Sequence, residues 1–444
     1  MKKFLLIPLA IILVTALIFG GCKPAAEVPE EIRVGASVAL TGMFSGFEGG
    51  GAWGLQAAVD DINKQGGLYV EEYGTKLPVR LIMADNESDA LKAGTLAEDL
   101  ILRDNVNFLA QTGSPQPAVN SIAMMAERYQ VPYFAVAGIK EQCMAVRAEL
   151  SPPWEYTWQC SFAIVVPYPP GSPSDKPGYT LADTTLMWLT DIADQTNKSA
   201  GVFATDEPDG RGWYSLFPGI LEEVGFTVCG LEKELGLFPL GSTDLSPLIQ
   251  EWMDCDVDLL MGNAPGVDTG VLLRQCHSMG FKPKAVWAGR GALFYVDVNS
   301  WGGDIPNGIC VEAQWRPTFN PELCPGIGDT TPMSLYERWH EDTGQPLNHA
   351  VSFGYIAAQA IFDAVEIVGT LDAAVVNEAI GETDMDTIIG PIWMEKDIHF
   401  AGFPMSVAQW RSTDQPWVWE CPLVYTVRED MGPTEELIFP IPYD

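Results

Sequence analysis

The sequence predicts an α/β fold built from two lobes, and three observations support this prediction. Strand-like and helix-like segments alternate from residue 32 to residue 136. The alternation breaks at residues 150–178, which are rich in proline and predict a long loop or linker, and it resumes from residue 201. Strands that alternate with helices form a parallel sheet with helices packed on its faces. Two such alternations therefore predict two parallel-sheet lobes.

In the first alternation, the spacing of hydrophobic residues clearly distinguishes strands from helices. Short runs of apolar, small and β-branched residues predict strands at residues 32–40, 79–84, 108–111 and 133–136. Between the first two strands, apolar residues recur at helical spacing over residues 53–65, and Gly66-Gly67 ends that helix. Further apolar helix faces cover residues 93–101 and 119–126.

The second alternation is followed by less regular sequence. Strands are predicted at residues 201–205, 226–231, 259–261 and 286–288, and helices at residues 213–224 and 271–279. Residues 299–331 are rich in glycine and proline and predict a loop. A strong helix is predicted at residues 351–368, and residues 410–425 form a Trp-rich final segment.

The N-terminus predicts export. Lys2 and Lys3 precede an apolar run from residue 4 to residue 19, followed by Gly-Gly and Cys22, which is the pattern of a secretory signal. A cysteine directly after small residues resembles a bacterial lipobox, which implies that Cys22 carries a lipid and becomes the mature N-terminus. We therefore expect the chain to work outside the cytoplasm, tethered to a membrane.

The amino-acid composition excludes some classes of function. The chain is 47% hydrophobic and 19% charged, as in a globular protein, and its net charge is −34. Such a surface repels nucleic-acid phosphates and anionic lipid headgroups, so no nucleic-acid partner is expected. A basic residue that lines a pocket is unusual in so acidic a chain.

The cysteines suggest disulfides. Eight of nine remain if Cys22 is lipidated, and an even number in an exported chain favours pairing. The local pairs Cys143–Cys160, Cys229–Cys255 and Cys310–Cys324 are compatible with the spacing, but the sequence leaves the connectivity open. No C-x-x-C motif occurs and the histidines are scattered, so we expect no metal site.

No catalytic motif is present in the sequence. It contains neither G-x-S-x-G nor H-E-x-x-H, and Gly49-Gly50-Gly51 lacks the Lys-Ser/Thr of a phosphate-binding loop. Catalysis needs an activated nucleophile or a tuned acid–base pair. We therefore expect a binding protein with no cofactor, not an enzyme.

Several short segments, in order, are similar to one family. They are IRVG at 32–35, ALTG at 39–42, AAVDDINKQGGL at 57–68 and QTGSPQPA at 111–118. With these segments the chain resembles the leucine/isoleucine/valine-binding proteins, the type I periplasmic solute-binding proteins of ABC importers, from about residue 32 to residue 410. The resemblance implies the periplasmic-binding-protein-like I fold, in which two doubly wound parallel-sheet lobes joined by three crossings close around a small solute.

The resemblance also implies domain boundaries. We expect a signal peptide at 1–22, a tether at 23–31, lobe 1 at 32–160 plus 312–395, and lobe 2 at 161–311 plus 396–444. We expect a monomer.

The family's ligand positions fall on particular residues of this chain. Thr112, Gly113 and Ser114 match its carboxylate-binding loop, where hydroxyl and N–H groups at a strand end suit an anion. An ordinary helix cap is the alternative interpretation. Ala137 and Gly138 match backbone contacts in the next loop.

Four further positions complete the expected site. Phe47 matches an aromatic over the ligand, although packing within its lobe would also explain it. Asp209 and Ala264 fall near aromatic positions of the family and depart from them. Arg290 stands where amino-acid-binding members carry a glutamate for the substrate ammonium. An arginine there would repel a cation and attract a carboxylate, unless it serves in a structural ion pair.

These observations give one functional hypothesis and three alternatives. We expect a lipid-anchored, extracytoplasmic protein that captures a small organic solute, an aromatic or dicarboxylic acid, and delivers it to an ABC permease. The alternatives are a branched-chain amino-acid or amide binder of the same family, a sensory ligand-binding domain, and an exported hydrolase on an α/β scaffold.

Overall fold

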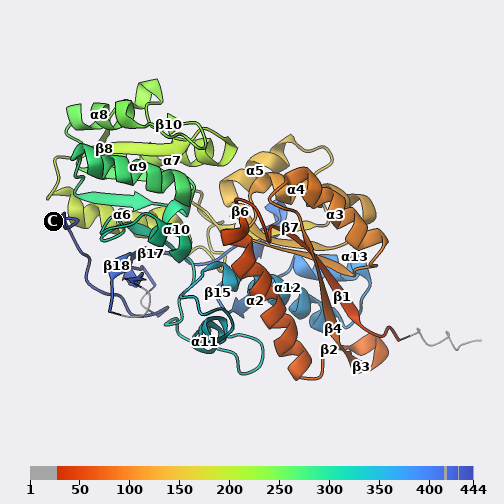
Figure 1. The fold of residues 1–444 in the computed structure, drawn as a ribbon. Helices are drawn as coiled ribbons and strands as arrows, with labels where there is room; N and C mark the ends of the chain where they lie inside the picture. The colour runs from red at the N-terminus through yellow and green to blue at the C-terminus, as the bar shows by residue number, and fades with distance from the viewer. Residues whose placement is uncertain (1–27, 415–417, 429, 444) are drawn as a thin grey trace, which may run out of the picture.

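Two lobes lie side by side in the computed structural model, which describes residues 28–414, 418–428 and 430–443 (Figure 1). Within these residues each lobe is built on an eight-stranded, mostly parallel sheet with helices on its faces. The predicted two-lobed α/β fold is confirmed. The expected lipidation site, Cys22, lies outside the described residues.

The sheet of lobe 1 collects strands from both ends of the chain. In spatial order its strands are β14 (Asp384–Thr387), β15 (Gly390–Glu395), β16 (Phe400–Gly402), β7 (Thr157–Phe162), β6 (Tyr133–Ile139), β5 (Phe108–Thr112), β1 (Ile32–Val38) and β4 (Val79–Asp85). Its helices are α2 (Ser45–Lys64), α3 (Ala90–Leu102), α4 (Gln116–Tyr129), α5 (Lys140–Glu149), α11 (Pro332–Thr343), α12 (Ala350–Val368) and α13 (Ala373–Ile380). A small hairpin of β2 (Leu68–Val70) and β3 (Thr75–Leu77) follows α2.

Lobe 2 repeats the pattern. Its sheet runs β10 (Leu237–Phe238), β8 (Ser199–Thr205), β11 (Leu259–Asn263), β12 (Ala285–Ala288), β13 (Cys310–Ala313), β17 (Ser406–Gln409) and β20 (Leu423–Tyr425), and β9 (Thr227–Val228) pairs with β8. Its helices are α6 (Leu181–Ala193), α7 (Pro208–Glu223), α8 (Ser246–Asp254), α9 (Gly266–Met279) and α10 (Tyr295–Ser300). β18 (Arg411–Ser412) and β19 (Trp419–Glu420) form a separate ribbon.

Two strands lie in segments for which the sequence predicted loops. The fully buried β7 lies inside the proline-rich stretch 150–178, and the equally buried β13 lies inside 299–331. Neither strand contains proline or glycine; these residues flank them. The prolines and glycines on either side predicted a loop in both places. A buried strand of four to six residues is too short for its hydrophobic pattern to override that prediction.

The chain passes between the lobes three times. The crossings are residues 163–180 after β7, residues 314–331 after β13, and residues 403–405 between β16 and β17. Strand pairing carries lobe 1 to residue 162 and lobe 2 to residue 313, slightly beyond the expected boundaries. It also puts β16 in lobe 1, although we expected residues from 396 onward in lobe 2.

Helix α12 forms the centre of lobe 1. Among the described residues it is the helix long and apolar enough to cross a membrane, but most of it is buried inside the lobe. It packs directly on α2, and a Cβ added at Gly54 or Gly354 would lie within 2 Å of the facing backbone. Burial on most sides explains why most of the residues of this helix are apolar.

Asp61 ties three helices together beneath this contact. Its carboxylate, 5% exposed, accepts hydrogen bonds from Arg338 of α11 at 2.5 and 2.9 Å. It also accepts from the hydroxyls of Tyr355 and Thr330, each at 2.7 Å. Burial alone would raise the pKa of Asp61, but these donors hold it below its ordinary value.

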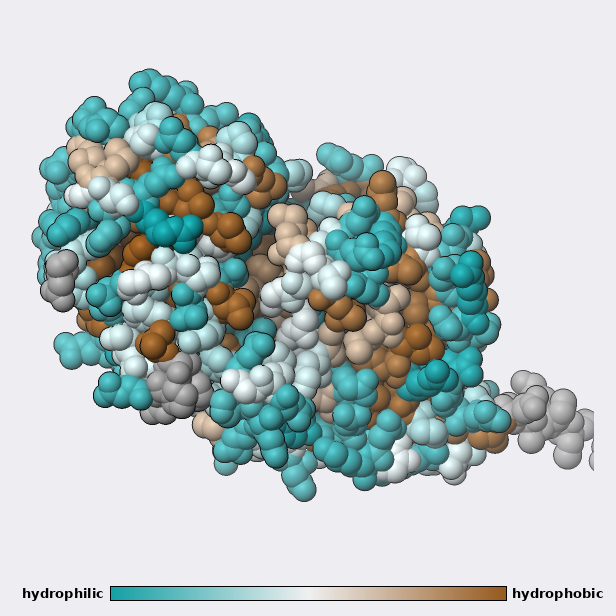
Figure 2. All heavy atoms as spheres, viewed as in Figure 1, coloured by the Kyte–Doolittle hydropathy of each residue, from teal (hydrophilic) through white to brown (hydrophobic). Residues whose placement is uncertain are grey.

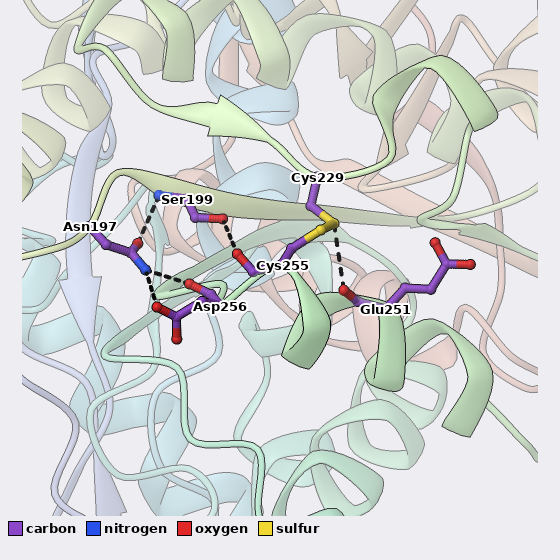
Figure 3. The surroundings of a disulfide bond; sticks show 6 residues. All are labelled: Asn197, Ser199, Cys229, Glu251, Cys255 and Asp256. Atoms are coloured by element: carbon purple, nitrogen blue, oxygen red, sulfur yellow. Dashed lines mark hydrogen bonds between the residues drawn. A yellow bond between two sulfur atoms is a disulfide. The ribbon is translucent and has the colours of Figure 1, made fainter.

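One disulfide is present in lobe 2. Cys229 and Cys255 are joined across the space between the end of β9 and the end of α8, near Ser199 and Asn197 (Figure 3). The other cysteines of the described residues are free and buried: Cys143, Cys160, Cys276, Cys310, Cys324 and Cys421. Two of the three local pairings considered, Cys143–Cys160 and Cys310–Cys324, are therefore wrong, and these thiols pack as small apolar side chains.

We predict six free thiols in the exported chain that follows Cys22. Alkylation under denaturing, non-reducing conditions and mass measurement should count six modified cysteines, with Cys229 and Cys255 unmodified. The same reagent applied to the folded protein should label none of the six rapidly, because all are buried. A count of two or fewer would contradict the structure.

Candidate functional site

A cavity lies between the two lobes, where the carboxyl ends of both parallel sheets face each other. It holds about 730 Å³ of space free of atoms, part of it open to solvent. Figure 2 shows a furrow between the two rounded lobes at this position, with hydrophobic residues in its depth. Ligands of open α/β sheets bind beyond the carboxyl ends of strands, so this cavity is the candidate site.

The cavity brings together most of the residues expected from the sequence. Those that line it are Phe47, Gly113, Ser114, Ala137, Gly138, Asp209 and Arg290. Thr112 and Ala264 lie behind the wall. Thr112 is fully buried close to Gly51 of α2, and the carbonyl of Ala264 accepts a hydrogen bond from Thr269 at 3.0 Å.

The wall supplied by lobe 1 offers fewer anion-binding groups than the sequence suggested. Pro115 caps α4 and Pro117, in its first turn, has no N–H. The N–H of Ala118 donates to the carbonyl of Pro115 at 3.0 Å. Two of the usual free donors of a helix N-terminus are therefore missing or engaged.

Ser114 is also committed within lobe 1. Its hydroxyl accepts from Gln111 Nε2 and hydrogen-bonds Glu48, a buried carboxyl in α2. The other bond to Glu48 comes from the Ala39 N–H at 2.7 Å. Burial raises the pKa of Glu48 to about 7, which Ser114 and Ala39 only partly offset.

Arg290 is held in an ion-pair network of lobe 2. Its guanidinium donates to Asp209 Oδ2 at 2.6 Å, to Glu207 Oε1 at 2.5 Å and to Thr205 Oγ1 at 2.8 Å. Its side chain is 13% exposed. Burial alone would raise the pKa of Glu207, but the charge and hydrogen bonds of Arg290 lower it. The structural ion pair, which was the alternative interpretation, is what the structure contains.

The same network reaches across the cleft. Gln142 of α5 in lobe 1 donates to Asp209 Oδ1 at 2.7 Å. Beside it, the ring of Phe47 meets the ring of Phe294 from lobe 2 edge-on, with centroids 4.4 Å apart. These contacts join the lobes directly, so the structure has the geometry of a closed cleft.

Sequence reasoning missed two polar residues of β13 and its end, Glu312 and Gln314. Both are 1% exposed and both line the cavity. Burial raises the pKa of Glu312 to about 8, and the charge of Asp209 adds to this. Polar residues do alternate with apolar ones from Val311 to Trp315, but these five residues are too few to outweigh the loop signal of the glycines and prolines around them.

The apolar walls were missed for a different reason. Five apolar residues from separate segments of the chain line the cavity: Phe44, Phe162, Trp213, Leu293 and Phe353. Aromatic residues are common in buried positions everywhere, so only tertiary structure selects these.

Comparison with known proteins gives the family. A sequence profile described as "Periplasmic binding protein" matches residues 31–415 of the chain. The chain belongs to the periplasmic binding protein family. Members are extracytoplasmic solute-binding proteins of ABC transporters, a binding rather than an enzymatic class.

Individual relatives are distant but extend over the whole fold. The chain is 23% identical over 383 residues to Leu/Ile/Val-binding protein homolog 7 of Brucella suis biovar 1, covering 85% of this chain and 86% of that protein. It resembles the leucine binding protein LivK of Thermotoga maritima, with a TM-score of 0.67, 18% identity and coverage of 90% and 99%. A solute binding protein of R. palustris in complex with 4-hydroxybenzoate has a TM-score of 0.65, 15% identity and coverage of 93% and 98%. This periplasmic binding protein therefore shares their fold.

We predict that Arg290→Met destabilises the ligand-free periplasmic binding protein by about 3 kcal/mol, because it leaves two partly buried carboxylates without their counter-ion. Urea unfolding monitored by tryptophan fluorescence would measure the change. Arg274→Met is the matched control, since Arg274 is an exposed arginine of the same lobe and should change stability by less than about 0.5 kcal/mol. Equal effects of the two substitutions would contradict the ion-pair role.

Proposed function

We propose that this protein captures one small organic solute between its lobes and delivers it to the membrane permease of an ABC importer. The observation that carries the proposal is the cavity at the lobe interface, lined by aromatic side chains and by polar groups from both lobes. A concave, largely apolar site with a few polar groups is the usual form of a small-molecule site. The family membership supports the transport role.

The nature of the solute is part of this proposal. The carboxylate hypothesis depended on a free Arg290, yet its charge is shared by Asp209 and Glu207. The donors of lobe 1 at Ser114 and α4 are also largely engaged. Of the alternatives, the amide binder is therefore better supported than an aromatic or dicarboxylic acid binder, and a solute with an amine group fits the same observations.

Capture should involve lobe closure. Three crossings of a few to about twenty residues act as hinges between rigid sheets, and hinge closure is the common response of such lobes to a ligand. The Gln142–Asp209 hydrogen bond and the Phe47–Phe294 contact form only when the lobes meet. We expect them to break in the ligand-free open form.

A solute screen tests the proposal. A bound solute at a hundred times its dissociation constant should add about 2.7 kcal/mol to the free energy of unfolding, which a thermal-shift assay detects. Solution scattering of the same sample should show a smaller radius of gyration than without the solute. Failure of amines, amides, amino acids and organic acids alike to bind would contradict the proposed function.

We also propose that Cys22 anchors the protein to a membrane through a lipid, on the strength of the signal pattern before it. Cys22→Ser should move the protein from the membrane fraction into the soluble exported fraction. Cys276→Ser is the control, because a buried cysteine of lobe 2 has no part in anchoring. Membrane retention of a Cys22→Ser protein whose signal has been cleaved would refute the lipid anchor.

A further inference from the structure

The polar end of the cavity is formed by β13, where two acceptor atoms lack partners. Glu312 Oε2 and Gln314 Oε1 are both buried without a hydrogen bond among the described residues. Glu312 lies on β13 and Gln314 directly follows its end, and both residues line the cavity. Unpartnered buried acceptors are costly, so this pair is arranged for a donor that arrives with the ligand.

The charge around this pair is negative. Among the described residues that line the cavity, Arg290 is the cation. Its two terminal nitrogens bind Glu207 and Asp209, which leaves one negative charge in excess, while its Nε has no partner. Asp209 is close enough for its charge to disfavour ionisation of Glu312. A ligand carboxylate at this end would meet further repulsion, whereas a ligand cation would be attracted.

At the opposite end of the cavity, several groups that the sequence suggested for anion binding are absent or engaged. Pro117 has no N–H, the N–H of Ala118 is engaged, and the hydroxyl of Ser114 is paired with Glu48. Ile139, at the end of β6, lines the cavity without any hydroxyl. The groups that would hold a carboxylate are absent or occupied at each of these positions.

The remaining walls favour an aromatic or otherwise apolar body. Phe44, Phe47, Phe162 and Trp213 come from both lobes and surround the space between the two ends. Aromatic faces attract cations as well as apolar groups. The same cavity can therefore hold the apolar part of a ligand against its aromatic walls and the charged group of that ligand at its polar end.

We propose that the cleft binds a protonated amine with an apolar, preferably aromatic body and no carboxylate, and that Glu312 and Gln314 accept the hydrogen bonds of its ammonium group. This inference rests on the proposed function and specifies its solute class. An ammonium group supplies both a charge that offsets Glu312 and donors for both unpartnered oxygens. The raised pKa of Glu312 fits this role, because the empty site then avoids an isolated buried charge.

The test compares matched probes on the intact exported protein. Benzylamine and phenethylamine should bind and raise the melting temperature, benzamide should bind more weakly, and benzoate and 4-hydroxybenzoate should not bind measurably. By calorimetry, Glu312→Gln, which keeps the shape and removes the charge, should weaken phenethylamine binding roughly 10- to 100-fold. Gln314→Met should weaken it about tenfold.

Controls separate this inference from the proposed function. Glu322→Gln removes an exposed acid from the same crossing and should leave phenethylamine affinity unchanged. The melting temperature of each ligand-free variant shows whether that variant folds. If Glu312→Gln does not fold, Gln314→Met still provides an independent test. Tight benzoate binding, or amine binding unaffected by both substitutions, would overturn the amine assignment while the solute-binding function stands. If neither amine binds, the assignment also fails, and the function fails only if the wider solute screen is negative as well.

Discussion

Three chain crossings hold the carboxyl ends of two parallel sheets opposite each other, and the rest of the site depends on this constraint. Ser114 follows β5, Gly138 lies at the end of β6, and Asp209, Arg290 and Gln314 follow strands of lobe 2. Parallel strands all end on one edge of a sheet, so each lobe gathers its polar loops at one edge. The crossings then make the two edges the walls of one cavity.

The contacts of Arg290 determine how charge is distributed along the wall of this cavity. In an acidic chain, a lone buried guanidinium would be a strong anion site, yet two acids from α7 and its cap neutralise it. Asp209 then has an oxygen left for Gln142 across the cleft. The arginine therefore positions the lobe-to-lobe contact. Its Nε is left without a partner among the described residues, and the unpartnered acceptors of the cavity lie at β13 and its end.

In lobe 1, tight helix packing holds the aromatic residues of the cavity wall in place. Asp61 binds α11 and the segment before it to α2, and the glycines at the α2–α12 contact let those helices approach closely. Phe47 projects into the cavity from the first turn of α2, and Phe353 from the first turn of α12. The aromatic wall of the site is thus fixed by the core packing of its lobe, which suits a cavity that must be complete when the lobes meet.

The sequence alone determined the two α/β lobes, the order of most strands and the family resemblance, because strand–helix periodicity and loop position are local properties. It also found Phe47, Ser114, Gly138, Asp209 and Arg290 at the cleft. Only tertiary structure decided what Arg290 contacts, which cysteines pair, and that two strands cross the predicted loops. Those outcomes depend on residues distant in the chain, Glu207 and Asp209 beside Arg290 or Cys229 near Cys255, and on burial that turns Glu312 from an ordinary surface acid into an unpartnered group facing the ligand space.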